Sequence, residues 1–186
     1  MFIQTEQTPN PATLKFLPGV AVLPGATANF TGAAEAAGKS PLAARLFEVD
    51  GVTGVYFGAD FITVAKDESK DWYLLKPSIL GTIMEHFAAG DPVITEDAGT
   101  DASAKASEDD DELVGQIKEL LETRVRPAVA QDGGDIVFQG FEKGVVYLQM
   151  QGACAGCPSS TMTLKAGVEN MLRHYIPEVT EVRAVF

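Results

Sequence analysis

One acidic segment divides this chain and limits what it can fold into. Residues 96–112 carry eight acidic residues against one basic residue, which accounts for −7 of the net charge of −12. The segment has no large apolar side chain, so burial cannot offset the conformational entropy that ordering it would cost. We therefore predict a flexible acidic linker at 96–112 that joins two small domains, residues 1–95 and residues 113–186.

The hydrophobic pattern of residues 113–186 predicts a small α/β (α+β) domain with the order α-β-β-α-β. Apolar residues recur at helical spacing in two stretches of this region, and two runs rich in β-branched residues lie between these stretches. The expected elements are a helix capped by Asp110 or Asp111, with a kink or new turn at Pro127 and a glycine cap near 131–134, then strands at 135–141 and 144–151 joined by a tight turn. A helix from Pro158, whose apolar face runs from Leu164 to Tyr175, and a strand at 179–185 follow.

The pattern of residues 1–95 predicts a second α/β domain, in which no set of catalytic residues is evident. The expected elements are strands near 2–5 and 12–17, a helix near 41–48, a hairpin across 52–64, a helix near 76–89 and a strand at 92–95. Trp72, Tyr73 and Phe87 flank the last helix. Aromatic side chains in this position favour a place in the core, and a binding patch for client proteins is the alternative.

The two cysteines of the chain, Cys154 and Cys157, lie between a predicted strand and the helix from Pro158. Two cysteines this close cannot staple a fold, which disfavours structural disulfides and favours a reducing compartment. Amides at a helix N-terminus stabilise negative charge and so promote the thiolate that binds metal or attacks a disulfide. The small residues at 152–153 and 155–156 predict that both sulfurs are open to a bulky inorganic partner.

Three chemistries compete for this spacing. Thioredoxin-like dithiol exchange uses the same strand-loop-helix geometry, but its site normally sits early in a longer fold. Zinc needs four ligands, and His86 and His174 are predicted to be surface or half-buried residues away from the sulfurs. An iron–sulfur cluster also takes four thiolates, which two chains could supply with Cys154 and Cys157 each. This stoichiometry predicts a homodimer that bridges one cluster.

Several segments resemble a known family. Four segments resemble the C-terminal domain of the NifU family, namely residues 123–136, 148–152, 154–160 and 167–177. Two further segments, residues 2–16 and 72–87, resemble the N-terminal domain of Nfu-type proteins. The resemblance implies a carrier, not an enzyme, that binds a [4Fe–4S] cluster, with [2Fe–2S] as the alternative, and delivers it to apo-proteins. The family's ligand positions carry over as Cys154 and Cys157.

The resemblance also implies partners, namely a second copy of the chain, an upstream cluster scaffold and apo iron–sulfur clients selected by the N-terminal domain. A thiol–disulfide oxidoreductase, in which Cys154 attacks and Cys157 resolves, stays open as the other function. The chain has no basic patch for nucleic acid and no apolar run long enough for a membrane span. Met1 abuts the first domain without an Arg- and Ser-rich leader, which favours bacterial cytoplasm, with the mitochondrial matrix as the eukaryotic alternative.

Overall fold

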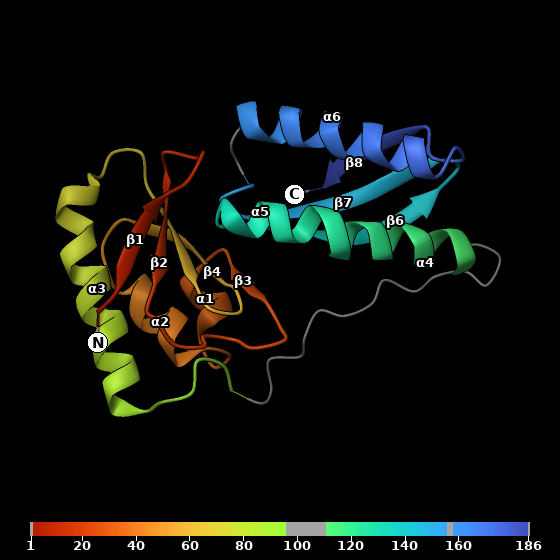
Figure 1. Cartoon of the computed structure of the whole chain (residues 1–186). Coiled ribbons are helices and arrows are strands. Elements are labelled where there is room, and N and C mark those ends of the chain that lie inside the picture. Colours follow the sequence, from red (N-terminus) through yellow and green to blue (C-terminus); the bar gives the residue numbers. More distant parts are fainter. Residues whose placement is uncertain (1, 96–110, 156–157, 186) are drawn as a thin grey trace. The chain divides into compact units, whose positions relative to one another are not determined.

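The chain forms two compact units, residues 1–101 and 102–186 (Figure 1). The computed structural model describes residues 2–95, 111–155 and 158–185. Each unit mixes helices and strands around a hydrophobic core of its own, which confirms the predicted fold class of two small α/β domains. Residues 96–110 of the predicted linker lie outside the described residues, so the flexibility of the linker stays a prediction.

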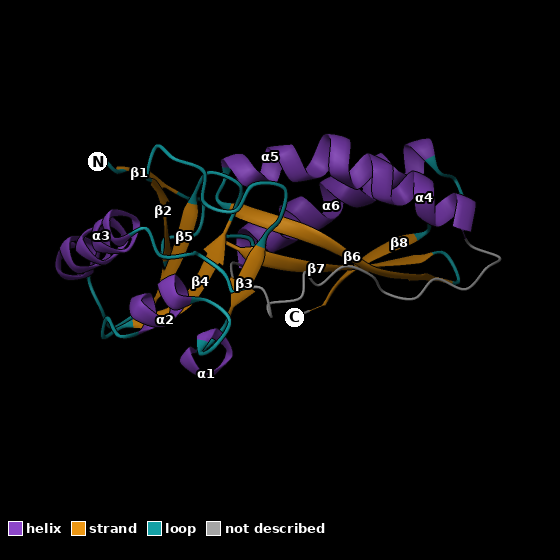
Figure 2. Cartoon of the chain, turned by 90° about the horizontal axis from the view of Figure 1, so that it is seen from below, coloured by secondary structure: helices purple, strands orange, loops and turns teal. Residues whose placement is uncertain are grey.

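The N-terminal unit is an antiparallel sheet with helices on one of its faces (Figure 2). The strand order is β1-β2-β5-β4-β3. The strands are β1 (Gln4–Gln7), β2 (Thr13–Leu17), β3 (Ala28–Phe30), β4 (Val52–Phe57) and β5 (Ile62–Lys66), and the helices are α1 (Ala33–Ala36), α2 (Pro41–Phe47) and α3 (Trp72–Ala89). Asp71 caps α3 by accepting the Tyr73 N–H at 2.9 Å, so this helix begins four residues earlier than predicted.

Two short elements of this unit were not predicted, and one predicted strand is absent. Strand β3 and helix α1 span three and four residues, too few to show a hydrophobic period. The strand expected at 92–95 is wrong. Thr95 donates its N–H to the Lys39 carbonyl at 2.9 Å, and the Ser40 hydroxyl donates to the Val93 carbonyl. This segment therefore binds the start of α2 instead of a sheet edge.

The C-terminal unit is a three-stranded sheet with its helices on one face (Figures 1 and 2). Strand β7 lies in the middle, antiparallel to β6 and parallel to β8. The elements are α4 (Asp111–Leu120), the π-helical segment η2 (Leu121–Val125), α5 (Arg126–Gln131), β6 (Gly134–Glu142), β7 (Val145–Gly152), α6 (Pro158–Tyr175) and β8 (Glu181–Val185). The predicted order α-β-β-α-β is confirmed.

The local sequence explains how these elements begin and end. Pro127 has no N–H to donate to the preceding turn, and the regular ladder is interrupted just before it, where the Arg126 N–H donates to the Leu121 carbonyl five residues earlier. The hairpin turns through Lys143 and Gly144, both with positive φ, the backbone that a two-residue hairpin loop requires. Side chains then alternate along β7 between buried and half-buried, as expected for a sheet covered on one face.

Helix α6 packs its apolar face onto this sheet. Val168 and Leu172 are buried, and Leu164 and Met171 are partly buried against the same core. Tyr175 was predicted to share this face, but it is 48% exposed and its ring lies 5.2 Å from the Arg124 guanidinium. The last turn of α6 thus places this ring beside a cation at the surface.

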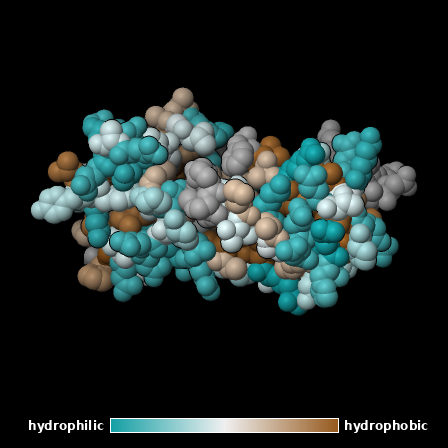
Figure 3. All heavy atoms as spheres, turned by 90° about the horizontal axis from the view of Figure 1, so that it is seen from above, coloured by the Kyte–Doolittle hydropathy of each residue, from teal (hydrophilic) through white to brown (hydrophobic). Residues whose placement is uncertain are grey.

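The visible face in Figure 3 is mostly hydrophilic, with hydrophobic atoms in small separate areas. Among the residues that the structure describes, none of the helices has the length and apolar character that a membrane crossing requires. The larger exposed apolar side chains include two neighbours at the start of α3, Tyr73 and Leu74, and Met162 near the start of α6.

Candidate functional site

The cysteine motif follows the end of the central strand of the C-terminal sheet. Strand β7 ends at Gly152, which has φ +62°, and the chain then turns toward α6. The Ala155 N–H donates to the Gly152 carbonyl at 3.1 Å, and the Thr161 hydroxyl donates to the Cys154 carbonyl at 3.3 Å. The turn is therefore tied both to the strand before it and to the first turn of α6.

The structure places Cys154 but not Cys157, which lies outside the described residues. Cys154 is only 5% exposed and belongs to the hydrophobic core of its unit, together with Met150 and Val168. The prediction of an open sulfur is therefore wrong for Cys154 in this conformation. Small neighbours in the sequence did not open the site, because a segment distant in sequence covers the thiol.

The cover is the glycine pair that opens β6. Gly133, with φ +78°, accepts the Ala153 N–H at its carbonyl at 3.2 Å, and Gly134 pairs with Gly152 across the sheet. A Cβ built on Gly134 would lie 2.3 Å from the Sγ atom of Cys154 and 2.9 Å from its backbone nitrogen. Only a glycine hydrogen fits between this strand and the thiol.

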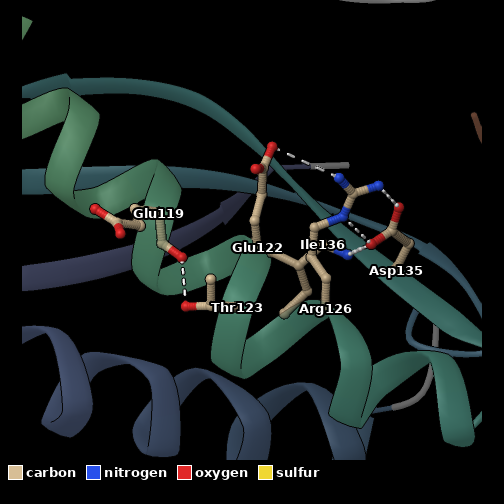
Figure 4. A network of polar contacts seen from close by, with 6 residues as sticks. All are labelled: Glu119, Glu122, Thr123, Arg126, Asp135 and Ile136. Atoms are coloured by element: carbon tan, nitrogen blue, oxygen red, sulfur yellow. Dashed lines mark hydrogen bonds and ion pairs between the residues drawn. The ribbon is translucent and has the colours of Figure 1, made fainter. Parts of the chain in front are cut away.

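An ion pair holds the residue that follows this glycine pair (Figure 4). Arg126 donates from Nε and Nη2 to the two carboxylate oxygens of Asp135, at 2.9 and 2.8 Å. Asp135 is 3% exposed, and its Oδ1 also accepts the Ile136 N–H at 2.8 Å. Glu122, one turn before Arg126, lies 4.0 Å from the guanidinium. The two-pronged geometry fixes the start of β6 to the start of α5.

Sequence reasoning missed the roles of these residues. It treated Gly133 and Gly134 as a helix cap and gave no role to Arg126 or Asp135. The available signal was their place inside the segment 123–136 that resembles the NifU family. Their position next to Cys154 depends on the register in which β6 pairs with β7, and no local sequence pattern predicts that register.

Neither histidine joins the cysteine site. His86 is completely buried in the N-terminal unit, contrary to the prediction, because it continues the buried face of α3 formed by Leu75, Ile79 and Ile83. His174 is exposed on α6. Within the described ranges, no group of three or more His, Cys, Asp or Glu side chains could hold a metal ion.

Burial lowers the pKa of His86, and the positive charge of Arg45 lowers it further. Asp91 and the backbone carbonyls of Pro92 and Asp91 act in the opposite direction. Neither ring nitrogen makes a hydrogen bond of good geometry to another described residue. His86 therefore favours its neutral form in the folded chain.

The aromatic residues around α3 divide between the core and the surface. Trp72 and Phe87 are partly buried against the N-terminal core, as predicted, and the Trp72 indole N–H donates to the Pro11 carbonyl at 3.2 Å. Tyr73 is 85% exposed and Leu74 is 70% exposed. The core interpretation is thus wrong for Tyr73.

Comparison with known proteins supports the resemblance. The family model described as "Scaffold protein Nfu/NifU N terminal" matches residues 3–90, and the model "NifU-like domain" matches residues 117–183. A Homo sapiens protein named "NFU1 iron-sulfur cluster scaffold homolog, mitochondrial" is 55% identical over 186 residues, covering 100% of this chain and 72% of that protein. This chain belongs to the Nfu family.

Other Nfu relatives are longer than this chain. Proteins of the same printed name from Drosophila sechellia and Drosophila simulans are 58% identical over 187 residues, and this chain spans 65% of the length of each. A solution structure of a NifU-like protein from Saccharomyces cerevisiae aligns with 52% of this chain and 87% of its own, at 29% identity and a TM-score of 0.47. A Staphylococcus aureus crystal structure aligns with 45% of this chain and 99% of its own, at 21% identity and a TM-score of 0.40.

The Nfu site can be tested chemically against an iron–sulfur cargo. Thiolates are the donors that such clusters take, and the Cys154 side chain is a donor of this kind on a turn lined by backbone and glycine. The donor type therefore fits the cargo. In the described conformation, however, the sulfur lies against Gly134 and is only 5% exposed, so iron can bind it only after the thiol is uncovered.

Proposed function

We propose that this Nfu chain binds an iron–sulfur cluster through Cys154 and Cys157 and delivers it to apo-proteins. The observation that carries the proposal is the position of Cys154 on a glycine-lined turn between β7 and α6 in a chain of this family. The curated relatives are named as iron–sulfur cluster scaffolds, which supports the same cargo. Binding and transfer need no catalytic group, so the proposed role is that of a carrier, not an enzyme.

The number of thiols supports a shared cluster. The chain has two cysteines, whereas [4Fe–4S] and [2Fe–2S] clusters take four protein ligands. Two copies related by a two-fold axis would each supply Cys154 and Cys157 to one cluster. We propose the [4Fe–4S] form, bridged in a homodimer. Uncovering a buried thiol when the cluster binds, and covering it again on release, suits a cargo that must leave.

The division of labour between the two units is part of the proposal. Residues 113–186 bind the cluster, residues 1–95 recognise clients and the upstream scaffold, and residues 96–112 join them. The adjacent side chains of Tyr73 and Leu74 support recognition by the N-terminal unit, because exposed large apolar groups are typical anchors of protein interfaces.

The names of the curated relatives favour the mitochondrial alternative for the location of the protein. Those proteins are named as mitochondrial, and nothing in the comparisons supports the bacterial cytoplasm that the start of the sequence favoured. Both compartments are reducing, which keeps the two thiols available for iron.

Anaerobic reconstitution with iron and sulfide tests the cargo and the stoichiometry together. Iron, sulfide and molar mass are measured on the same chromatographic peak for the parent, Cys154→Ser and Cys157→Ser, with His174→Ala as a surface control. The proposal expects about four irons per dimer for the parent and the control, and none for either cysteine variant. A colourless monomer whose dithiol titrates reversibly against glutathione would replace the carrier with the oxidoreductase.

The oxidoreductase has weaker support from the structure. A thiol attacks a disulfide as an accessible thiolate, whereas Cys154 is buried. The Cys157→Ser variant of that test also distinguishes the two functions. An oxidoreductase that lacks Cys157 would accumulate a mixed disulfide through Cys154.

A further inference from the structure

The ion pair between Arg126 and Asp135 lies one residue away from the cover of the cysteine. We propose that these two residues are positioning residues for Cys154, because their pair holds the start of β6 against the cysteine turn and keeps the thiol covered in the metal-free chain. The inference deepens the proposed function and rests on it for its biological meaning. Its test, however, needs no iron.

The first step is the rigidity of the pair itself. Its two charge-assisted hydrogen bonds, at 2.9 and 2.8 Å, fix both the distance and the orientation of the carboxylate. The Asp135 side chain is 4% exposed and that of Arg126 is 35% exposed. Water cannot readily replace the guanidinium at so enclosed a carboxylate, so the pair resists opening more than a surface ion pair does.

The second step leads from Asp135 to the sulfur. Asp135 pairs with Gln151, and Gly134 pairs with Gly152, so these two residues set the register at the end of β7 where the cysteine turn begins. The Gly134 backbone touches the Cys154 thiol, as the 2.3 Å separation of a built Cβ from Sγ shows. Any movement of Asp135 away from Arg126 therefore moves the cover of the thiol.

The third step is the position of Arg126. It begins α5 directly after the π-helical segment η2 and lies nine residues before Asp135. The chain between them contains the end of α5 and the turn at Gly133, whose positive φ directs the chain back into the sheet. The ion pair closes this loop, and the loop carries the carbonyl that binds the Ala153 N–H.

Alkylation of Cys154 measures the cover directly. In a Cys157→Ser background Cys154 is the single thiol, and its reaction with iodoacetamide is followed by mass spectrometry on metal-free protein under native conditions. Asp135→Asn and Arg126→Gln are each expected to react roughly tenfold faster than the background, since a loosened strand start opens locally more often. Arg126→Lys, which keeps one charged donor, is expected to fall between them and the background.

Two controls separate positioning from general loss of stability. Arg183→Gln removes another ion pair of the same unit, that with Glu181 at 3.1 Å, and is expected to leave the rate unchanged. Val182→Ala creates a core cavity beside Val146. Val146 lies at the start of β7, whereas the cysteine turn follows the other end of this strand. Urea unfolding of every variant shows how much each has lost globally.

Equal alkylation rates in Asp135→Asn, Arg126→Gln and the background would overturn the inference. It would also be overturned if Val182→Ala, at the same loss of global stability, reacted as fast as Asp135→Asn. If Asp135→Asn does not fold, the comparison of Arg126→Lys with Arg183→Gln decides the matter. If the Arg126 and Asp135 variants react faster but the parent chain never binds iron, the proposed function is wrong and the positioning role of the ion pair is still supported.

Discussion

Gly134 and Cys154, twenty residues apart in the chain, meet so closely that a Cβ on the glycine would lie 2.3 Å from the cysteine sulfur. The backbone of Gly134 does not have positive φ, so a need for left-handed backbone does not explain the glycine. The explanation is space. In the described conformation this contact lies against the buried thiol, and it makes residue 134 a sensitive position for substitution.

Gly134→Ala is expected to lower the free energy of unfolding by about 1–3 kcal/mol, because the new methyl group must displace both the sulfur and the backbone behind it. The matched control is Gly140→Ala on the same strand, where a built Cβ meets nothing within 4 Å. Urea unfolding measures both variants. Equal stability of the two alanine variants would contradict the close contact.

Leu172→Ala is expected to destabilise only the C-terminal unit, by about 2–5 kcal/mol, because Leu172 is fully buried in the core of that unit. The single tryptophan, Trp72, lies in the N-terminal unit, so its fluorescence reports the other core. The tryptophan midpoint should stay constant while part of the circular dichroism signal is lost at lower urea concentration. A common shift of both signals would show that the two cores unfold together.

His86 is expected to make the N-terminal unit less stable in mild acid. Its pKa in the folded chain is lowered, so below the unfolded value of about 6.5 the unfolded chain binds the proton more readily. The contribution of neutral His86 to the free energy of unfolding should be complete above that pH, and it should fall as the pH drops toward the lowered pKa of the folded chain. Tryptophan-detected unfolding from pH 7.5 to 5 measures the slope, with His174→Gln as the exposed control.

The control should keep the slope, whereas His86→Gln should reduce it. Arg45 and Asp91 face the histidine and form an ion pair with each other at 3.0 Å. A slope that persists in His86→Gln would assign the pH dependence to other groups.

Replacing Tyr73 and Leu74 with serine is expected to change the stability of the chain by no more than about 0.5 kcal/mol, because both side chains are already in water. If they contact clients, cluster transfer from the reconstituted double variant to an apo [4Fe–4S] enzyme should slow, whereas its iron content should not change. Met84→Ser, toward the other end of α3 and 44% exposed, is the matched control. Transfer at the parental rate by the double variant would remove this surface from the proposal.

The sequence could predict those elements whose signals are local. The hairpin of β6 and β7 follows from two β-rich runs around Lys143 and Gly144, and α6 follows from apolar residues at helical spacing after Pro158. Strand β3 has three residues and could not show a period, and residues 92–95 look like a strand although they bind the start of α2.

The site was harder to predict because its decisive contacts join distant segments. The sequence places Cys154 between a strand and a helix, but its burial depends on Gly134, which reaches it only through strand pairing. The bond between Arg126 and Asp135 depends in turn on the helix ending where it does. Composition around the cysteine therefore indicated an open site, and tertiary packing closed it.

The parallel pairing of β7 with β8 has a consequence for how the protein matures. Strand β8 follows α6 in the chain, so during synthesis the cysteines and the helix behind them leave the ribosome before the strand that completes the sheet. Until β8 docks, β7 has one unpaired edge and the core beneath α6 lacks Val182. The cysteine turn and its glycine cover from β6 can therefore form before β8 docks, so the last step of folding completes the sheet edge and the core rather than the site.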